Sequence, residues 1–366
     1  MRVYNKYQES QPNSCVLCHR TYRAISKVIG VCPNCIQNNF DQAWKILQAT
    51  HSKSRQEFHL PTKPPRQPEG VQCTLCSNEC QIAEGEKGYC GLREVHNGKL
   101  VHLAGTHTQG LLQWYRDPLP TNCVADWVCE GRHHLGYHNL AVFYGSCTAN
   151  CLFCQNWHFR EITTSPFETI SAEQLANVAN SRTFCVCYFG GDPSSQMPHA
   201  LATSKLLAQK GVRICWETNG MMNPKFLDVA VRYSLETGGC IKFDLKAYDE
   251  EIHLALTGVS NQRTLENFAR AAARTYERIR PPLVVASTLL VPGYIDAKQV
   301  EKIARFIASL NPQIPYALLA FAPNFYMSDL PCTSTQQAEQ AEKAAREAGL
   351  VNVRIGNRHL LGWEYN

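Results

Sequence analysis

Residues 145–157, GSCTANCLFCQNW, contain three cysteines, Cys147, Cys151 and Cys154, in a C-x3-C-x2-C spacing. Such a loop can place three thiolates on three irons of a cubane [4Fe-4S] cluster and leave the fourth iron without a protein ligand, whereas four cysteines hold most such clusters. The loop follows an apolar, β-prone run at residues 140–144, LAVFY, as expected where a strand ends in a tight turn. A structural zinc loop and three unrelated buried cysteines remain alternatives on this spacing alone.

Downstream of residue 139, short apolar runs alternate with helical patterns. The runs are LAVFYG, TFCVCYFGG, VRICWETN, CIKFDL, LVVASTLLVPG and YALLAF. Between them, Ser171 and Gln174 have the spacing of a capping box that begins a helix. The segments LENFARAAARTYERI and AKQVEKIARFIASL have apolar residues at a period of 3.6. Six strands that alternate with helices predict a parallel sheet in an α/β fold.

Four short motifs follow the cysteine loop, each at the end of an apolar run. They are GGDP at 190–193, ETNG at 217–220, DLK at 244–246 and LVPG at 290–293. The ordered set, over roughly residues 70–360, resembles the radical S-adenosylmethionine (radical SAM) superfamily, and the second and third motifs resemble the activating enzymes of glycyl-radical enzymes. The resemblance implies that the sheet curls into a partial (β/α)6 TIM-like barrel.

The resemblance also implies residues that contact SAM. Gly190, Gly191 and Asp192 correspond to the motif that holds the SAM amino group, and glycine has no Cβ to keep its backbone from a ligand. Asp192 stands where many relatives have glutamate. Phe153 occupies the position of an aromatic residue that contacts adenine, with core packing as the alternative.

Polar residues at the ends of the next two runs complete this implied site. Glu217 stands where activating enzymes commonly have aspartate, and with Thr218 and Asp244 it could hold a monovalent cation beside the SAM carboxylate. Lys246 could reach the SAM carboxylate or ribose, and the alternative for any lysine is surface exposure.

Residues 1–60 read as a small module with two CxxC knuckles. Paired knuckles build tetrahedral thiolate sites for zinc, and rubredoxin-like iron would suit the same geometry. We favour zinc in a structural role, with four free thiols as the remaining alternative. A helix is expected at residues 43–49, and the Pro-rich stretch LPTKPPRQPEG marks the module's end. The four cysteines are Cys15, Cys18, Cys32 and Cys35.

A second cysteine-rich segment lies within residues 61–135, before the barrel at 136–366. It resembles the segment that precedes the barrel in activating-enzyme-like, AmmeMemoRadiSam-type proteins and in the enzyme that methylates an arginine of methyl-coenzyme M reductase. We expect a closed four-thiolate site that stabilises the fold, with mononuclear iron or an auxiliary cluster as alternatives. The proposed ligands are Cys73, Cys76, Cys80 and Cys90.

The stretch LLQWYRDPLPTNC, residues 111–123, contains Tyr115 and Asp117. An ordinary loop is the first expectation, because aspartate before proline favours an extended turn. The stretch also resembles a segment of the arginine-methylating enzyme in which a tyrosine can cap the open iron, which makes Tyr115 a candidate. Cys123 and Cys129 could be metal ligands, but buried free cysteine is common.

Composition restricts the classes of function. The 366 residues are 44% hydrophobic and have a net charge of +5, without a lysine or arginine run that would indicate nucleic acid. The N-terminus lacks the apolar core of a signal peptide, and no apolar stretch is long enough to span a membrane. Eighteen cysteines without a secretory signal indicate metal binding in a cytoplasmic protein rather than disulfides.

These patterns predict a radical SAM enzyme. The resemblance implies that it cleaves SAM reductively at a [4Fe-4S] cluster to a 5′-deoxyadenosyl radical, with an electron from an external flavodoxin- or ferredoxin-type reductant. Hydrogen abstraction from a peptide or protein is the expected reaction, by association with activating enzymes. The alternative is a cobalamin-dependent C-methyltransferase, although the short C-terminal stretch leaves little room for a corrinoid module. A metal-binding scaffold is the non-enzymatic alternative.

Overall fold

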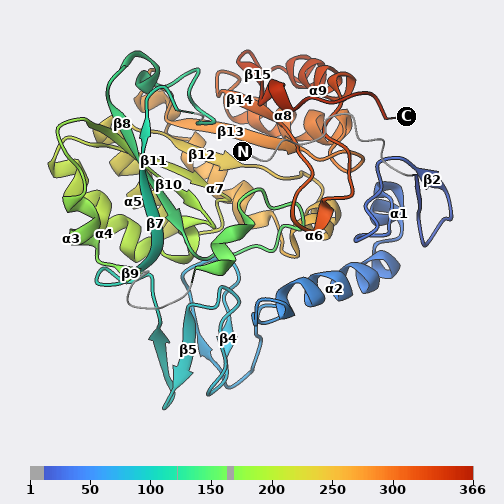
Figure 1. The fold of residues 1–366 in the computed structure, drawn as a ribbon, viewed down its shortest axis with the longest axis horizontal. Helices are drawn as coiled ribbons and strands as arrows, with labels where there is room; N and C mark the ends of the chain where they lie inside the picture. The colour runs from blue at the N-terminus through green and yellow to red at the C-terminus, as the bar shows by residue number, and fades with distance from the viewer. Residues whose placement is uncertain (1–11, 122, 163–168, 366) are drawn as a thin grey trace.

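A nine-stranded sheet is the main element of the computed structural model, which describes residues 12–121, 123–162 and 169–365 (Figure 1). Its strand order is β15-β14-β13-β12-β11-β10-β8-β7-β9. From β8 to β15 neighbouring strands are parallel, whereas β7 pairs antiparallel with both β8 and β9. The bounds are β7 Gly110–Pro118, β8 His138–Tyr144, β9 Thr169–Ile170, β10 Thr183–Gly190, β11 Arg213–Thr218, β12 Ile241–Asp244, β13 Val284–Leu290, β14 Tyr316–Ala320 and β15 Val353–Gly356.

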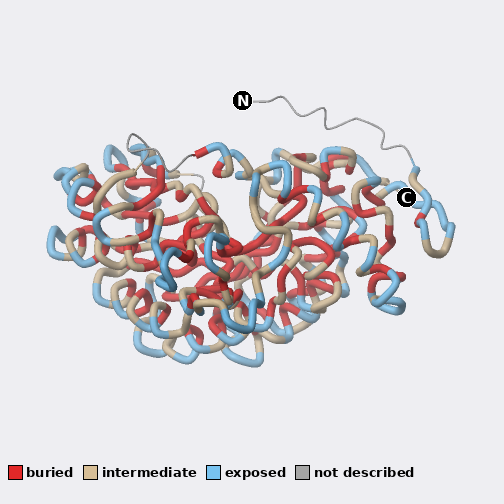
Figure 2. The backbone as a smooth tube through the Cα atoms, turned by 90° about the horizontal axis from the view of Figure 1, so that it is seen from below, coloured by how far each residue is buried: buried red, intermediate tan, exposed pale blue. Residues whose placement is uncertain are grey.

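Helices alternate with these strands and cover the sheet. In α8, Val300, Ile303 and Ile307 are completely buried, and their 3.6-residue period puts one apolar face on the core. The capping box predicted at Ser171 and Gln174 is present at the start of α3. Buried residues gather in the middle of the molecule (Figure 2). The bounds are α3 Ala172–Asn177, α4 Met197–Gln209, α5 Pro224–Thr237, α6 Glu250–Thr257, α7 Gln262–Ala272, α8 Ala297–Leu310 and α9 Thr335–Glu347.

The α/β fold with a large parallel sheet confirms the predicted fold class. All six apolar runs form strands, β8 and β10 to β14. Three further strands complete the sheet, of which the short β9 pairs with β7. The C-terminal run NVRIG supplies β15, which pairs with β14, and residues 110–118 form β7 rather than the loop expected around Tyr115. The prediction of a loop around Tyr115 was wrong. The exposed residues of β7 pair with the backbone of β8, and this pairing cannot be recognised from the local sequence.

The N-terminal module is small and lies against the barrel. It consists of the hairpin β1 Asn13–Ser14 and β2 Thr21–Tyr22, followed by α1 Pro33–Asn38 and α2 Phe40–Gln56, so the helix expected at 43–49 is longer than predicted. On α2, His51 Nε2 lies 3.1 Å from the carbonyl oxygen of Ala255 in α6. Ser26 Oγ donates to Asp329 Oδ1 at 2.9 Å. These contacts join the module to the rest of the fold.

Two short hairpins form the second cysteine-rich segment, below the sheet in Figure 1. Their strands are β3 Val71–Gln72, β4 Gln81–Ile82, β5 Arg93–His96 and β6 Lys99–His102. Asn78 Nδ2 donates to the carbonyl oxygen of Thr148 at 2.8 Å, so the segment touches the cysteine loop that follows β8. None of the helices in the described residues has the length and apolar character needed to cross a membrane.

Candidate active site

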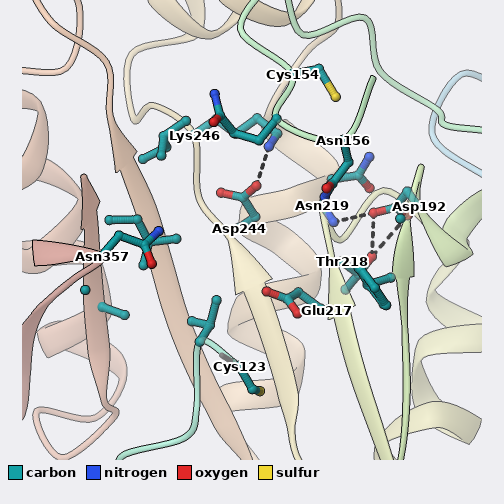
Figure 3. A pocket seen from close by; sticks show the side chains of 18 of the residues that line it. Cys123, Cys154, Asn156, Asp192, Glu217, Thr218, Asn219, Asp244, Lys246 and Asn357 are labelled. Atoms are coloured by element: carbon teal, nitrogen blue, oxygen red, sulfur yellow. Dashed lines mark hydrogen bonds and ion pairs between the residues drawn. The ribbon is translucent and has the colours of Figure 1, made fainter. Parts of the chain in front are cut away.

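A cavity of about 600 Å³ opens at the carboxyl ends of the parallel strands (Figure 3). Its walls come from β10 to β14 and the segments that follow β8, β10, β11 and β12. The rest is formed by β7 and the segment after it, and by β15 and the residues after it. Barrel enzymes place their active sites at this end of the strands, because the loops there can vary without disturbing the core. The cavity is therefore the candidate active site.

The cysteine loop forms one wall of the cavity, with Cys147, Cys151 and Cys154 among the lining residues. The backbone N–H groups of Asn150 and Leu152 donate to carbonyl oxygens at the end of α6, at 2.8 and 3.0 Å, and fix the loop. The three sulfurs do not form a group within 4.8 Å of one another, the spacing that marks a single-ion site elsewhere in the described residues.

Burial raises the pKa of each of these three thiols, that of Cys151 to about 12. Nearby positive charges oppose the effect: Lys246 lowers the pKa of Cys151, and Arg160 that of Cys154. Bound metal removes the thiol proton outright, because the cation stabilises the thiolate. The donor set therefore fits an iron cluster, with two basic side chains that favour the thiolate form.

Asp192, at the end of β10, is buried and accepts several hydrogen bonds. Its carboxylate accepts from the backbone N–H of Ser194 at 2.7 Å, from that of Asn219 at 2.6 Å and from the Thr218 hydroxyl at 3.1 Å (Figure 3). Burial still raises the pKa of Asp192 above 3.8. A buried carboxylate at a cavity wall can bind a ligand ammonium, so the residue fits its implied role toward SAM.

The two glycines before Asp192 also line the cavity, and their contact with SAM stays a prediction. A Cβ on Gly191 would lie 2.1 Å from the carbonyl oxygen of Ser146, and Gly190 has a φ of +101°. The backbone N–H of Gly191 donates to Tyr144 at 2.8 Å. Glycine is needed here because the end of β10 packs against the backbone of the cysteine loop.

Lys246 is not a surface lysine, since its side chain is only 12% exposed. It forms an ion pair with Asp244, and although burial lowers the pKa of Lys246, this carboxylate holds it above its usual value. Its Nζ lies 5.6 Å from the centre of the Phe153 ring, which is itself 4% exposed. The structure thus brings these predicted SAM contacts together at the cavity.

The three residues expected to hold a monovalent cation have separate partners. Glu217 Oε2 lies 3.6 Å from Nζ of Lys242, Asp244 pairs with Lys246, and the Thr218 hydroxyl is bonded to Asp192. All three line the cavity, and a shared cation site stays a prediction.

Tyr115 projects from β7 into the same cavity and is 48% exposed. Its ring meets that of Phe189 edge-on, with centroids 6.4 Å apart. Asp117 lines the cavity two residues later on the same face of the strand, where it accepts a hydrogen bond from Thr121. Contact between Tyr115 and an iron remains a prediction.

The N-terminal cysteines form a compact group. The sulfurs of Cys15, Cys18, Cys32 and Cys35 all lie within 4.8 Å of one another, with Cys18 and Cys32 3.8 Å apart. Zinc–sulfur bonds of about 2.3 Å in a tetrahedron put the sulfurs about 3.8 Å apart. Burial raises the pKa of Cys15, but backbone N–H donors led by that of Cys32 outweigh it and bring it to about 6. The geometry fits one tetrahedral ion.

The second cysteine group is looser. Cys73, Cys76 and Cys80 are buried, and no three sulfurs of this group meet the 4.8 Å spacing that the N-terminal group does within the described chain. The carbonyl oxygen of Cys90 accepts from the Ser146 hydroxyl at 2.9 Å, which places the group beside the cysteine loop. A four-thiolate site here stays a prediction.

Several cavity residues were not singled out from the sequence. Asn219 lies inside the ETNG motif, and its Nδ2 is 2.9 Å from the Thr148 hydroxyl and 3.8 Å from Cys147 Sγ. Arg354 and Asn357 reach the cavity from β15 and the turn after it. Only Asn219 had a local signal, its place in a motif.

Comparison with known proteins identifies the domain. Residues 141–307 match the model of the radical SAM superfamily. The chain therefore contains a radical SAM domain and is an enzyme that uses SAM for radical chemistry, with an iron–sulfur cluster as the domain requires.

Relatives include activating enzymes. An uncharacterized protein of Methanocaldococcus jannaschii is 25% identical over 293 residues, 78% of this chain and 81% of that protein. A putative glycyl-radical enzyme activating enzyme of the same organism is 29% identical over 224 residues, 59% of this chain and 80% of that one. The pyruvate formate-lyase 1-activating enzyme of Escherichia coli is 29% identical over 163 residues, 42% and 62% of the two chains. The predicted resemblance is confirmed at the level of the superfamily.

Proposed function

We propose that this enzyme abstracts hydrogen from a peptide or protein substrate. The observation that carries the proposal is the single cavity that brings Cys147, Cys151 and Cys154 together with the buried carboxylate of Asp192. SAM bound at a reduced cluster supplies a radical that can remove hydrogen from a nearby C–H group. The enzyme's relatives include activating enzymes, which act on other proteins, and this supports a protein or peptide as the substrate class.

Each wall of the cavity has a role in this proposal. The three thiolates would hold the cluster, and Asp192 would bind the SAM ammonium. Lys246 and Phe153 lie side by side where they can contact the SAM carboxylate and adenine. The wall that carries Tyr115 and Arg354 lies on other strands, β7 and β15, and is available to the substrate.

A reconstitution assay tests the proposal. The protein, loaded anaerobically with iron and sulfide, is incubated with SAM and dithionite, and 5′-deoxyadenosine and methionine are measured. We expect both products to form. An external flavodoxin or ferredoxin should be able to replace dithionite as the electron donor. Absence of 5′-deoxyadenosine from protein with a full cluster would overturn the proposal and favour a metal-binding scaffold.

The cobalamin-dependent methyltransferase remains the alternative, with no observation in the structure that favours it. Corrinoid that copurifies with the enzyme and a methylated product would identify it. Zinc at the N-terminal group and action in the cytoplasm are further parts of the proposal.

A further inference from the structure

Lys242 is a buried lysine that the proposed function does not use. It lies on β12 beneath the cavity, and its side chain is 1% exposed. Its Nζ is 2.9 Å from Sγ of Cys187 on β10 and 3.0 Å from Sγ of Cys123, which follows β7. Its one ion-pair partner among the described residues is Glu217, at 3.6 Å. Two sulfurs are thus closer to this ammonium than its carboxylate partner is.

These two nitrogen–sulfur distances are shorter than comparable contacts in the same molecule. Seven other contacts between a nitrogen or oxygen and a sulfur measure 3.4–4.0 Å. Hydrogen bonds that involve an ionised group are shorter than neutral ones, so the charge of the ammonium accounts for part of this closeness. The same closeness puts Nζ and Sγ within reach of one bridging oxygen atom.

The surroundings suit a covalent link between these atoms. Cys187 is 5% exposed, so water has little access to an oxidised form of its sulfur. A small cavity of about 40 Å³ is lined by Lys242, Cys187 and Cys123. A cavity needs about 10–15 Å³ of such space to hold one water, so a diatomic molecule such as dioxygen fits there. The reactive atoms and a space for the oxidant therefore adjoin.

We propose that Lys242 and Cys187 are a modification site, where dioxygen joins Nζ to Sγ through a single oxygen atom. The S–H bond and two N–H bonds break, and one S–O and one N–O bond form. The second oxygen atom leaves as water, and one proton is released. Sulfur and nitrogen each give up two electrons, and dioxygen takes up all four. Glu217, the nearest carboxylate, accepts the proton.

The link would join strands that are not neighbours, because β11 lies between β10 and β12. It would also convert the ammonium into a neutral nitrogen, so Glu217 would lose its counter-charge beneath the cavity. Cys123 is the less suitable partner, because it also lines the large open cavity, where water can intercept its oxidised sulfur.

Peptide mass spectrometry of the full chain tests this site without SAM or a substrate. Protein purified without oxygen is divided, one half is exposed to air, and both are alkylated and digested. In the air-exposed half we expect a peptide with Lys242 linked to one with Cys187, heavier than their sum by one oxygen less two hydrogens. Dithiothreitol should return both residues to their free forms. The Cys123→Ala variant is the matched control and should keep the link.

Two results would overturn the proposal. One is an air-exposed wild type in which Cys187 occurs only as a thiol, a disulfide or an oxidised acid, with Lys242 unmodified. The other is a linked peptide in equal amount in the half kept without oxygen. Lys242→Met and Cys187→Ala should each abolish the linked peptide, so the readout does not depend on the folding of one variant. Since no step uses SAM, failure here is independent of the proposed function.

Discussion

The N-terminal cysteine group and the cysteine loop after β8 show how similar ligands serve different ends. In the first, four sulfurs lie within 4.8 Å of one another, so a bound ion would have no free position. In the second, the three cysteines of the loop line an open cavity of about 600 Å³, which leaves room for a reactant beside them. A closed thiolate site stabilises the fold, whereas an open one can bind a reactant. The cysteine loop after β8 is therefore the site suited to catalysis.

The largest effect should come from removing one ligand of the open site. In Cys151→Ala, two thiolates remain and the cluster is not held with one open iron, so SAM cleavage should be abolished. 5′-Deoxyadenosine formation by anaerobically reconstituted protein is the measurement. Cys332→Ala, outside the three cysteine groups, is a control that should stay active. Wild-type cleavage by Cys151→Ala would contradict the assignment.

Asp192→Asn should weaken SAM binding while leaving the cluster in place. A hydrogen bond to a charged group contributes about 1.5–3 kcal/mol, which is about 10- to 150-fold in affinity. Burial raises the pKa of Asp192 above 3.8, so its carboxylate is protonated at a higher pH than that of an exposed aspartate. As the pH is lowered, the affinity of the wild type for SAM should therefore begin to fall earlier. Calorimetric titration with SAM across pH measures both effects. A pH-dependent loss that persists in Asp192→Asn would assign it to another group.

Changes in the closed site should affect stability rather than chemistry. Cys15→Ala with Cys18→Ala should lose one equivalent of metal and lower the melting temperature by about 5 °C or more, since about 1 kcal/mol shifts it by 2–4 °C in a domain of about 150–250 residues. SAM cleavage should persist. Elemental analysis and calorimetry are the measurements. If the variant kept its metal but lost SAM cleavage, the contrast between the two sites would be wrong.

His51, on α2, connects the N-terminal module with the cysteine loop after β8. Its Nδ1 accepts a hydrogen bond from Nδ2 of Asn150 in that loop at 2.9 Å. Burial lowers the pKa of His51 from 6.5 to about 4. The unfolded chain therefore binds more protons between these values, and stability should fall as the pH drops from 6.5 toward 4, by at most about 3 kcal/mol from this residue.

Urea unfolding at several pH values, for wild type and His51→Gln, measures this contribution. The variant should lose part of the pH dependence. His199 and His253 have pKa values lowered to about 4 by burial as well, so some dependence should remain. Identical pH profiles for wild type and variant would show that His51 does not titrate as described.

The smallest effect concerns Tyr115. If its phenol ligates the open iron before SAM arrives, Tyr115→Phe should alter the paramagnetic resonance spectrum of the reduced cluster only in the absence of SAM. Tyr137→Phe, a half-exposed tyrosine that does not line the cavity, is the matched control. Identical SAM-free spectra for wild type and Tyr115→Phe would leave Tyr115 as an ordinary strand residue.

Local sequence determined the features that need only short-range information. The spacing of the two CxxC knuckles led to the N-terminal group, because tight turns bring each pair of sulfurs together within a few residues. The six apolar runs became parallel strands, since burial on both faces requires continuous apolar sequence. The order of motifs after these strands indicated which residues would meet at one end of the sheet.

Only the tertiary structure decided which distant residues line the cavity and which lie beneath it. The pairing of β7 with β8 turned an expected loop into a strand, and β15 brought Arg354 to the cavity. Lys242 lies in the run CIKFDL, and its neighbours come from β10, β11 and the segment after β7. Such contacts depend on strand order and register, which no local pattern encodes.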